Sequence, residues 1–300
     1  MSAQSPLNTS LFTETVKQGL QAQGTLLPHV MSETYSGTEE AEIRKHMLPV
    51  ELELIKSKGQ LREVKEIEYK SRYIEKNTYA ICNYTDKLDK LNTAVGNIDS
   101  EIVKTTVAAA QRTVDSVIID AFFGNASVKN GASRTTETFP ATSVVDADYD
   151  TVGDVGINLV KIEKSMTMLK DQLIMPLGLR IGMTPKQHAL LLKDISATAN
   201  NIYQEGIKGQ SLPTIWGMQI VETTLFERLE VGGIDYLPIW DIGSMHFGWF
   251  GNEQIYIDVI QNDPLMALGG QNTVRGHLTI GATRSNQDGA GVIKVACART

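Results

Sequence analysis

The stretch IDSEIVKTTVAAAQRTVDSVIIDAFFG, residues 98–124, decides the fold of this 300-residue chain. Apolar residues recur along it at steps of three and four, a spacing that places them on one side of a helix. They are Val103, Val107, Ala110, Val114, Ile118 and Ala121, and the polar residues opposite them are Glu101, Lys104, Arg112, Asp115 and Ser116. Gly124 suits a helix C-cap, and Asn97 or Asp99 suits the N-cap. We predict one amphipathic helix over residues 98–123, roughly 39 Å long.

Upstream of this helix, half of the residues between positions 51 and 76 are charged, and both signs are mixed. Apolar residues alternate with charged ones in both parts of the stretch: Val50, Leu52 and Leu54, then Ile67, Tyr69 and Tyr73. This period of two, with the sequence KSKG between the parts, predicts a two-stranded hairpin. A helix is the alternative, because Leu61, Val64 and Ile67 are spaced by three and Glu/Lys pairs are common on helices. A charged hairpin alone is not stable in water and needs a partner surface.

The rest of the chain predicts an α+β protein. Residues 1–48 are broken by glycines and have no pattern long enough for a core, so we expect an arm that lies on another surface. The small polar residues of 125–150 indicate a surface loop or short edge strands. A second helix is expected near 153–171, where five apolar residues keep helical spacing: Val155, Leu159, Ile162, Met166 and Leu169.

The second half of the chain predicts more strands than helices. Residues 179–183 form an apolar run, and Thr184-Pro185 after it is a helix start with proline at the first position. The sequence TIWGMQIVETTLF, residues 214–226, indicates a turn and a strand. From position 235 onward, short apolar segments separated by Gly, Asn, Asp and Pro indicate a series of strands.

The overall composition argues against nucleic-acid-gripping and membrane-spanning proteins. The net charge is -7 and the pI is about 5.3, so the chain lacks the basic character of a protein that grips nucleic acid. No apolar run approaches the roughly 18 residues of a membrane span, and the first residues do not read as a leader, so we expect the cytoplasm. Cys82 and Cys297 fit no metal or redox spacing and are expected to be buried thiols.

The sequence contains no pattern that predicts catalysis or a cofactor. Five histidines are scattered without ligand spacing, and phosphate-binding and nucleophile motifs are missing from the sequence. Residues 268–277, LGGQNTVRGH, have the glycines of an anion cradle near Arg275, although a turn before a strand explains them better. Asp86 and Asp89 are spaced to hold a cation but more simply are solvated or capping residues. Trp216, Trp240 and Trp249 lie in apolar segments and are expected in the core.

Four stretches, taken in order, carry a resemblance to a known family. They are YKSRYIEKNTYAICNYTDKLDKLN, residues 69–92; the helix of residues 99–124; LRIGMTPKQHALLLKD with IWGMQIVETTLF, residues 179–194 and 215–226; and HLTIGATRSNQDGAGVIKVA, residues 277–296. Together they resemble the major capsid protein of tailed double-stranded DNA bacteriophages, the HK97 fold, and within it the capsid proteins of T7-type short-tailed phages. The resemblance covers most of residues 69–299.

The resemblance implies an HK97-like arrangement of the chain. It has an N-terminal arm over 1–48, an extended loop built as a β-hairpin over 49–80, and a peripheral domain over 81–174 that contains the spine helix near 98–123. An axial domain over 175–260 follows, and residues 261–300 are strands that return to the peripheral domain. Contacts between subunits are expected along the extended loop, at its charged residues: Glu51, Glu53, Lys56, Lys58, Arg62, Glu63, Lys65 and Glu66.

The function implied is that of a major capsid protein, a structural protein and not an enzyme. Copies of the chain would assemble as pentamers and hexamers into an icosahedral shell, formed in the host cytoplasm and located in the virion. The shell would enclose double-stranded DNA without sequence-specific binding and without membrane contact. No long helical pro-segment precedes the arm, so a separate scaffolding protein is expected, with a portal and a decoration protein as further partners. The alternatives are an encapsulin-type nanocompartment shell protein and, with less support, a metal-dependent enzyme using Asp86 and Asp89.

Overall fold

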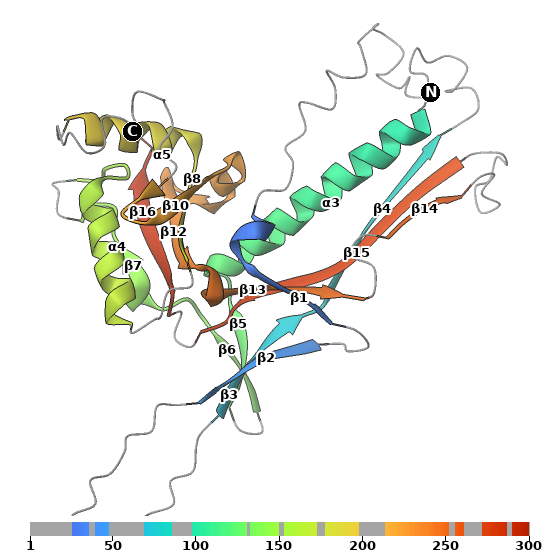
Figure 1. Cartoon of the computed structure of the whole chain (residues 1–300), viewed down its shortest axis with the longest axis horizontal. Helices are drawn as coiled ribbons and strands as arrows, with labels where there is room; N and C mark the ends of the chain where they lie inside the picture. Colours follow the sequence, from blue (N-terminus) through green and yellow to red (C-terminus); the bar gives the residue numbers. More distant parts are fainter. Residues whose placement is uncertain are drawn as a thin grey trace, which may run out of the picture.

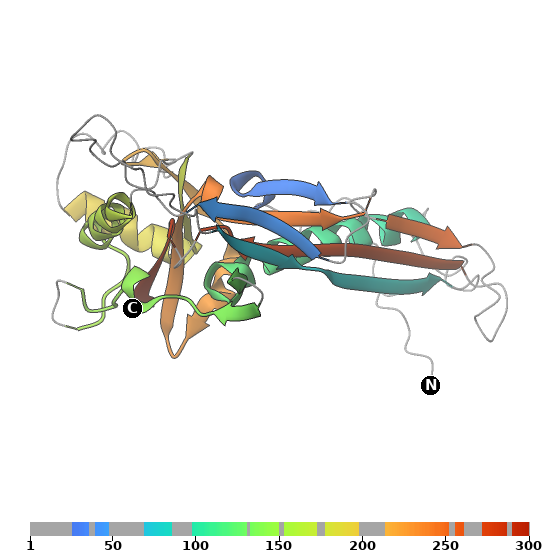
Figure 2. The same cartoon turned by 90° about the horizontal axis from the view of Figure 1, so that it is seen from below.

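The computed structural model describes residues 26–35, 40–47, 69–85, 98–130, 133–149, 153–172, 178–197, 214–251, 256–260, 272–286 and 290–299. These residues form three β-sheets of five, seven and four strands, with helices packed on the two larger sheets. The molecule is elongated: the five-stranded sheet and a long helix extend to one side, and the seven-stranded sheet with its shorter helices lies at the other (Figures 1 and 2).

The long helix is α3 (Ile98–Phe123), with the bounds that the sequence predicts. It lies along the five-stranded sheet, which has the order β1 (Met31–Tyr35), β13 (Met245–Phe250), β15 (Asn272–Arg284) and β14 (Tyr256–Ile260). The fifth strand, β4 (Asn77–Thr85), pairs with β15 over nine residue pairs. Figure 2 shows α3 running beside these strands for much of its length.

The side of α3 that faces the sheets is the predicted apolar one, with one exception. Ala110, Val114 and Ile118 are buried, and Ile119 and Phe122 are buried beside them. Asp115, which the pattern places on the polar side, is completely buried, and its Oδ1 accepts a hydrogen bond of 3.0 Å from the Leu26 N–H. The helical period wrongly predicted that Asp115 is exposed. Its partner is a backbone N–H 89 residues away in sequence, and periodicity carries no information about such a contact.

The seven-stranded sheet has the order β7 (Val144–Val145), β16 (Val292–Ala298), β12 (Ile234–Asp241), β8 (Leu179–Met183), β10 (Met218–Glu222) and β9 (Thr214–Ile215). The seventh strand, β11 (Glu230–Val231), pairs with β12. Helices α4 (Leu159–Asp171) and α5 (Pro185–Ala197) contribute to the core on one face. The predicted strand 179–183 and the helix start at Pro185 are confirmed.

The third sheet contains four antiparallel strands: β2 (Glu40–Met47), β3 (Tyr69–Glu75), β5 (Ala126–Asn130) and β6 (Ser133–Glu137). The last two are the short strands expected within 125–150. The described part of the predicted hairpin, Tyr69–Glu75, is a strand. Residues 51–68, for which strand and helix were the alternatives, lie outside the described residues.

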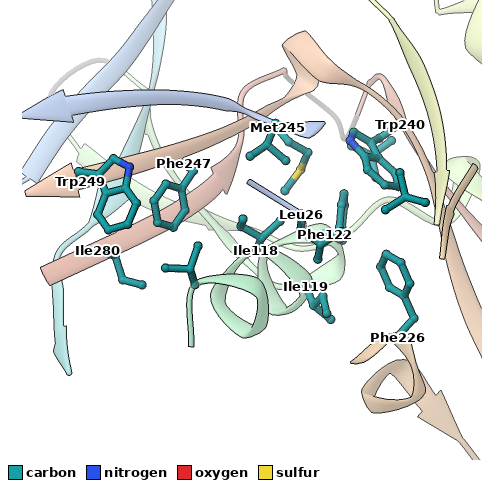
Figure 3. Packing of buried hydrophobic residues seen from close by; sticks show 14 of the residues in the cluster. Leu26, Ile118, Ile119, Phe122, Phe226, Trp240, Met245, Phe247, Trp249 and Ile280 are labelled. Carbon is teal, nitrogen blue, oxygen red and sulfur yellow. The ribbon is translucent and has the colours of Figure 1, made fainter. Parts of the chain in front are cut away.

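The end of α3 joins the two larger sheets through a shared hydrophobic core (Figure 3). The Phe122 ring lies 4.7 Å from the Trp240 ring and 6.5 Å from the Phe226 ring, centroid to centroid. Strand alternation explains how one sheet serves two cores: Leu237 and Ile239 of β12 face α4 and α5, whereas Trp240 faces α3. The two larger sheets therefore form one packed unit.

Three strands from the last part of the chain show how its segments are shared between the two larger sheets. β13 and β14, placed by the prediction in the axial segment 175–260, belong to the five-stranded sheet beside α3. β16, from the segment 261–300 expected as return strands, pairs with β12 in the seven-stranded sheet, and α4 packs on β16. Hydrogen-bonded pairing of strands distant in sequence has no local signal, so the chain crosses between the sheets more often than contiguous ranges allow.

Three smaller expectations were also wrong. Helix α4 begins at Leu159 and not near 153, because the Asn158 side chain accepts the Lys161 N–H at 2.9 Å and caps the helix there. Cys82 is exposed, whereas Cys297 is buried as predicted, and both are free thiols. Trp216 lies in a turn between β9 and β10 and is exposed, in contrast to the buried Trp240 and Trp249.

None of the helices in the described ranges has the length and apolar character of a membrane span.

Candidate functional site

The eight charged residues predicted to contact a neighbouring subunit all fall between positions 51 and 66, outside the described residues. Their role stays a prediction. Asp86 and Asp89 also lie outside the described ranges. The described residues do include the base from which the charged stretch arises, and this base is the candidate site for contacts between subunits.

The base is an antiparallel stem formed by β2 and β3. Glu40 pairs with Glu75 at one end and Met47 pairs with Tyr69 at the other, so the two strands are neighbours where residues 48–68 connect them. The stem includes residues 40–47, which belong to the segment expected to form the N-terminal arm. The sequence did not predict strand β2 because its charged composition, EAEIRKHM, gives a weak strand signal.

Two buried arginines hold the stem against the end of α3. Arg72 of β3 and Arg284 of β15 are each only 1% exposed. Arg72 Nη1 donates to the Arg284 carbonyl oxygen at 3.2 Å, and its Nη2 donates to Glu137 of β6 at 2.6 Å. Arg284 Nη1 donates to the carbonyl oxygens of Phe122, at 3.1 Å, and of Gly124. A cation at these carbonyls is also favoured by the dipole at the helix C-terminus.

The arginine pair combines hydrogen bonding with electrostatic strain. Burial, and then the nearby Arg72, lowers the pKa of Arg284 to about 10, while Glu137 acts in the opposite direction. Among the described residues, Nε of Arg72 and both Nε and Nη2 of Arg284 have no acceptor. The Arg284 guanidinium lies 5.2 Å from the centre of the Phe139 ring. The cluster connects β3, β6, β15 and the end of α3, and so fixes the direction in which the stem leaves the molecule.

A close backbone crossing adds to this attachment. A Cβ on Gly281 of β15 would overlap the carbonyl oxygen of Glu75 and the side chain of Ile74. Glycine is therefore required where β15 passes the end of β3. Ile74 is completely buried in a small cluster with Phe250 and Tyr35.

The segment before β1 connects both larger sheets. The N–H of Leu26 is held by Asp115 of α3, and the carbonyl oxygen of His29 accepts a hydrogen bond of 2.8 Å from Trp240 Nε1. Arg180 Nε donates to His29 Nδ1 at 3.3 Å, and burial followed by the Arg180 charge lowers the pKa of His29. β1 then pairs in parallel with β13. The described part of the predicted arm therefore lies on the body of its own chain.

Buried polar side chains also fix the last strand. Lys161 of α4 is completely buried, and its Nζ donates to the carbonyl oxygens of Ala147, Val155 and Ala296 at 2.8–2.9 Å. Burial lowers the pKa of this ammonium group. Gln187 of α5 donates to Ala298 O at 2.9 Å and to Asp235 at 3.0 Å. These contacts hold β16 to the seven-stranded sheet.

The residues that the sequence offered for chemistry have defined structural surroundings where the structure describes them. The described residues contain no group of three His, Cys, Asp or Glu residues positioned to hold a metal ion. His29 Nδ1 accepts a hydrogen bond from Arg180, and His188 Nδ1 is hydrogen-bonded to Glu222. In both pairs the partner lies far away in the sequence. Burial raises the pKa of the Cys297 thiol to about 12, which makes it a poor nucleophile. Residues 272–277 of the predicted glycine loop belong to strand β15, paired on both sides by β4 and β14.

Sequence reasoning did not find Arg72, Arg284 or Lys161. Each lies in a segment whose residue pattern indicates only a strand or a helix. The local sequence carries little signal for them, because a buried charge needs partners that only the folded chain reveals.

Solved structures similar to this chain are phage capsids. The capsid of Ralstonia phage GP4 matches with a TM-score of 0.71 at 10% identity, over 99% of this chain and 95% of that chain. The cyanophage Pam1 capsid matches with a TM-score of 0.72 at 10% identity, over 97% and 95%. The head of Helicobacter pylori bacteriophage KHP40 matches with a TM-score of 0.70 at 10% identity, over 100% and 98%. At such low identity these matches show the fold, which is the HK97-like α+β fold.

Sequence comparison supplies the family. No curated protein matches the chain. The sequence model of the family described as phage capsid protein matches residues 7–298. Because this match spans nearly the whole chain, the protein belongs to the phage capsid protein family.

Proposed function

We propose that this chain is the major capsid subunit of a tailed bacteriophage, which assembles as pentamers and hexamers into an icosahedral shell around double-stranded DNA. The single observation that carries the proposal is the family match over residues 7–298. The three similar structures support it, because each is a phage capsid or head and each covers nearly all of this chain.

The architecture suits a subunit that is completed by its neighbours. α3, with 26 residues, gives each copy a stiff rod, and the core around Phe122 fixes that rod to both larger sheets. The stem of β2 and β3 is attached at its base through the Arg72 and Arg284 cluster. A charged hairpin extending from this base would lie on an adjacent copy, where pairs of opposite charge give orientation and register more than affinity.

The acidic character of the chain fits a container for DNA. With a net charge of -7, the subunit is expected to hold DNA phosphates only weakly, so a packaged genome would remain free to leave. The partners that follow from this role are a scaffolding protein, a portal and a decoration protein, with assembly in the host cytoplasm and a final location in the virion. The eight charged residues between Glu51 and Glu66 are the proposed contacts of the extended loop.

Negative-stain electron microscopy of the purified chain, expressed alone and with the neighbouring candidate scaffold gene, tests the proposal. Closed shells, or rings and tubes of regular subunits, are expected in at least one of the two preparations. A chain that stays a monomer or small oligomer in both preparations rejects shell formation.

A further inference from the structure

The turn between β9 and β10 holds an unexpected residue. Ile215 pairs with Met218, so the hairpin loop is the two-residue sequence Trp216-Gly217. The φ angles are 46° at Trp216 and 79° at Gly217. Both residues are in the left-handed region, which is the geometry of a type I′ hairpin turn. Asn-Gly is the sequence this turn prefers, because asparagine tolerates positive φ and a bulky residue with a Cβ does not.

Trp216 is thus strained without an evident benefit to its own fold. It is the one non-glycine residue with positive φ in the described ranges. Its side chain is 40% exposed, whereas Trp240 is 0% and Trp249 is 5% exposed. Strained backbone positions persist where function requires the side chain, so an observed outlier of this kind points to a role outside the fold.

A second hairpin in the same sheet gives an internal comparison. Between β11 and β12 the two-residue loop is Gly232-Gly233, with φ angles of 63° and 85°. The residue before this loop, Val231, is 66% exposed. The same kind of turn is built there from glycine alone. At Trp216 the chain instead places a large aromatic ring, at the cost of the strain.

The surroundings of Trp216 favour protein over nucleic acid as the group that covers it. The hairpin sequence 214–219, TIWGMQ, contains no charged residue, whereas aromatic platforms for nucleic acid are interleaved with basic residues. Arg180, opposite Gln219 in the neighbouring strand, already donates to His29 and to the Leu179 carbonyl oxygen. Exposed tryptophan in an uncharged setting is typical of the central contacts of protein interfaces.

We propose that Trp216 is an anchor residue in the contact between neighbouring copies of this chain. The inference rests on the proposed shell function, in which the edges of each subunit are covered by other copies. Among the described strands, β9 is the last of the seven-stranded sheet, and the exposed Trp216 ring at its hairpin is available to an adjacent copy. In the shell, the Trp216 ring is buried in the partner surface, and the strain of the free subunit is offset by that contact.

Acrylamide quenching of tryptophan fluorescence tests the inference directly, because all three tryptophans of the chain have defined exposure. In the unassembled subunit, one quenchable component is expected, and Trp216→Asn should remove it. In wild-type shells that component should be protected. Shells that form normally but leave Trp216 as quenchable as in the subunit overturn the inference while the proposed function stands. Protection that appears only in DNA-filled particles, and not in empty shells, assigns the contact to the genome and also overturns it.

The same substitution separates an assembly role from a structural one. Trp216→Asn creates Asn-Gly, so the melting temperature of the subunit should rise, by about 2 °C. The yield of shells at a fixed protein concentration should fall about tenfold. Val231→Ala is the matched control and should change neither quantity. If Trp216→Asn forms shells as well as wild type does, or if Val231→Ala lowers the yield equally, the inference is wrong. A wild-type chain that forms no shells rejects the proposed function itself, and the inference with it.

Discussion

At the scale of single residues, buried charges determine how the parts of this protein are connected. The Arg284 side chain donates hydrogen bonds to carbonyl oxygens at the end of α3, and the Arg284 carbonyl oxygen accepts a hydrogen bond from Arg72. Lys161 Nζ donates hydrogen bonds to three carbonyl oxygens, which come from three different segments. At both positions the hydrogen bonds run from Arg284 Nη1 or Lys161 Nζ to backbone carbonyl oxygens of other segments. Their function is to fix strands that are distant in sequence.

Replacing Arg284 by methionine should lower the free energy of unfolding by about 2 kcal/mol, the worth of a charged group's hydrogen bonds. The loss is limited because Arg72 then no longer faces a second buried cation. Denaturant unfolding measures it. Arg228→Met is the matched control. Arg228 Nη2 lies 3.3 Å from a carboxylate oxygen of Asp120 on α3, but both side chains are largely exposed. That exposed pair should contribute less than about 0.5 kcal/mol. Equal effects of the two substitutions would contradict the role given to Arg284.

The lowered pKa of Lys161 predicts a pH dependence of stability. Between the folded pKa and the unfolded value of 10.5, the unfolded chain binds more protons, so stability rises with pH in that window. Below the folded pKa both states are protonated and the contribution is constant. The difference in unfolding free energy between wild type and Lys161→Met should therefore shift in favour of wild type as pH approaches 10.5. A shift in the opposite direction would mean that the folded pKa is raised.

At the scale of elements, the sequence predicted local structure far better than pairing. α3 was predicted with its bounds because its 26 residues repeat one helical pattern and Gly124 follows directly after it. β8 and the start of α5 followed from an apolar run and a Thr-Pro step. The pairing of β16 with β12, and of β13 with β15, was not predictable, since strands distant in sequence leave no mark on each other. Trp216 was misjudged because its apolar neighbours indicate a strand, and the turn depends on backbone angles.

Ala110→Asp tests the orientation of α3. Ala110 is 7% exposed within the core that the helix shares with the five-stranded sheet, and a charge there would be buried without a partner. The variant is expected to be insoluble or unable to assemble, as judged by sedimentation and electron microscopy. Thr105→Asp, on an exposed position of the same helix, should remain soluble. Normal shells from Ala110→Asp would show that the buried face is assigned wrongly.

At the scale of the whole molecule, the described chain consists of one large packed unit and one attached stem. The core around Phe122 merges α3 with both larger sheets, so these parts are expected to move together. The four-stranded sheet is joined to them by the small cluster of Ile74, Phe250 and Tyr35 and by the arginine pair. The described part of the stem is therefore held in a defined direction relative to the large unit.

Cryo-electron microscopy of particles assembled from this chain tests the central claim most directly. The account predicts closed shells whose subunits form five-fold and six-fold rings, with the density of each subunit containing one long rod for Ile98–Phe123 and a stem that reaches an adjacent copy. A reconstruction without such rings, or a chain that remains a monomer with and without its scaffold, would contradict it.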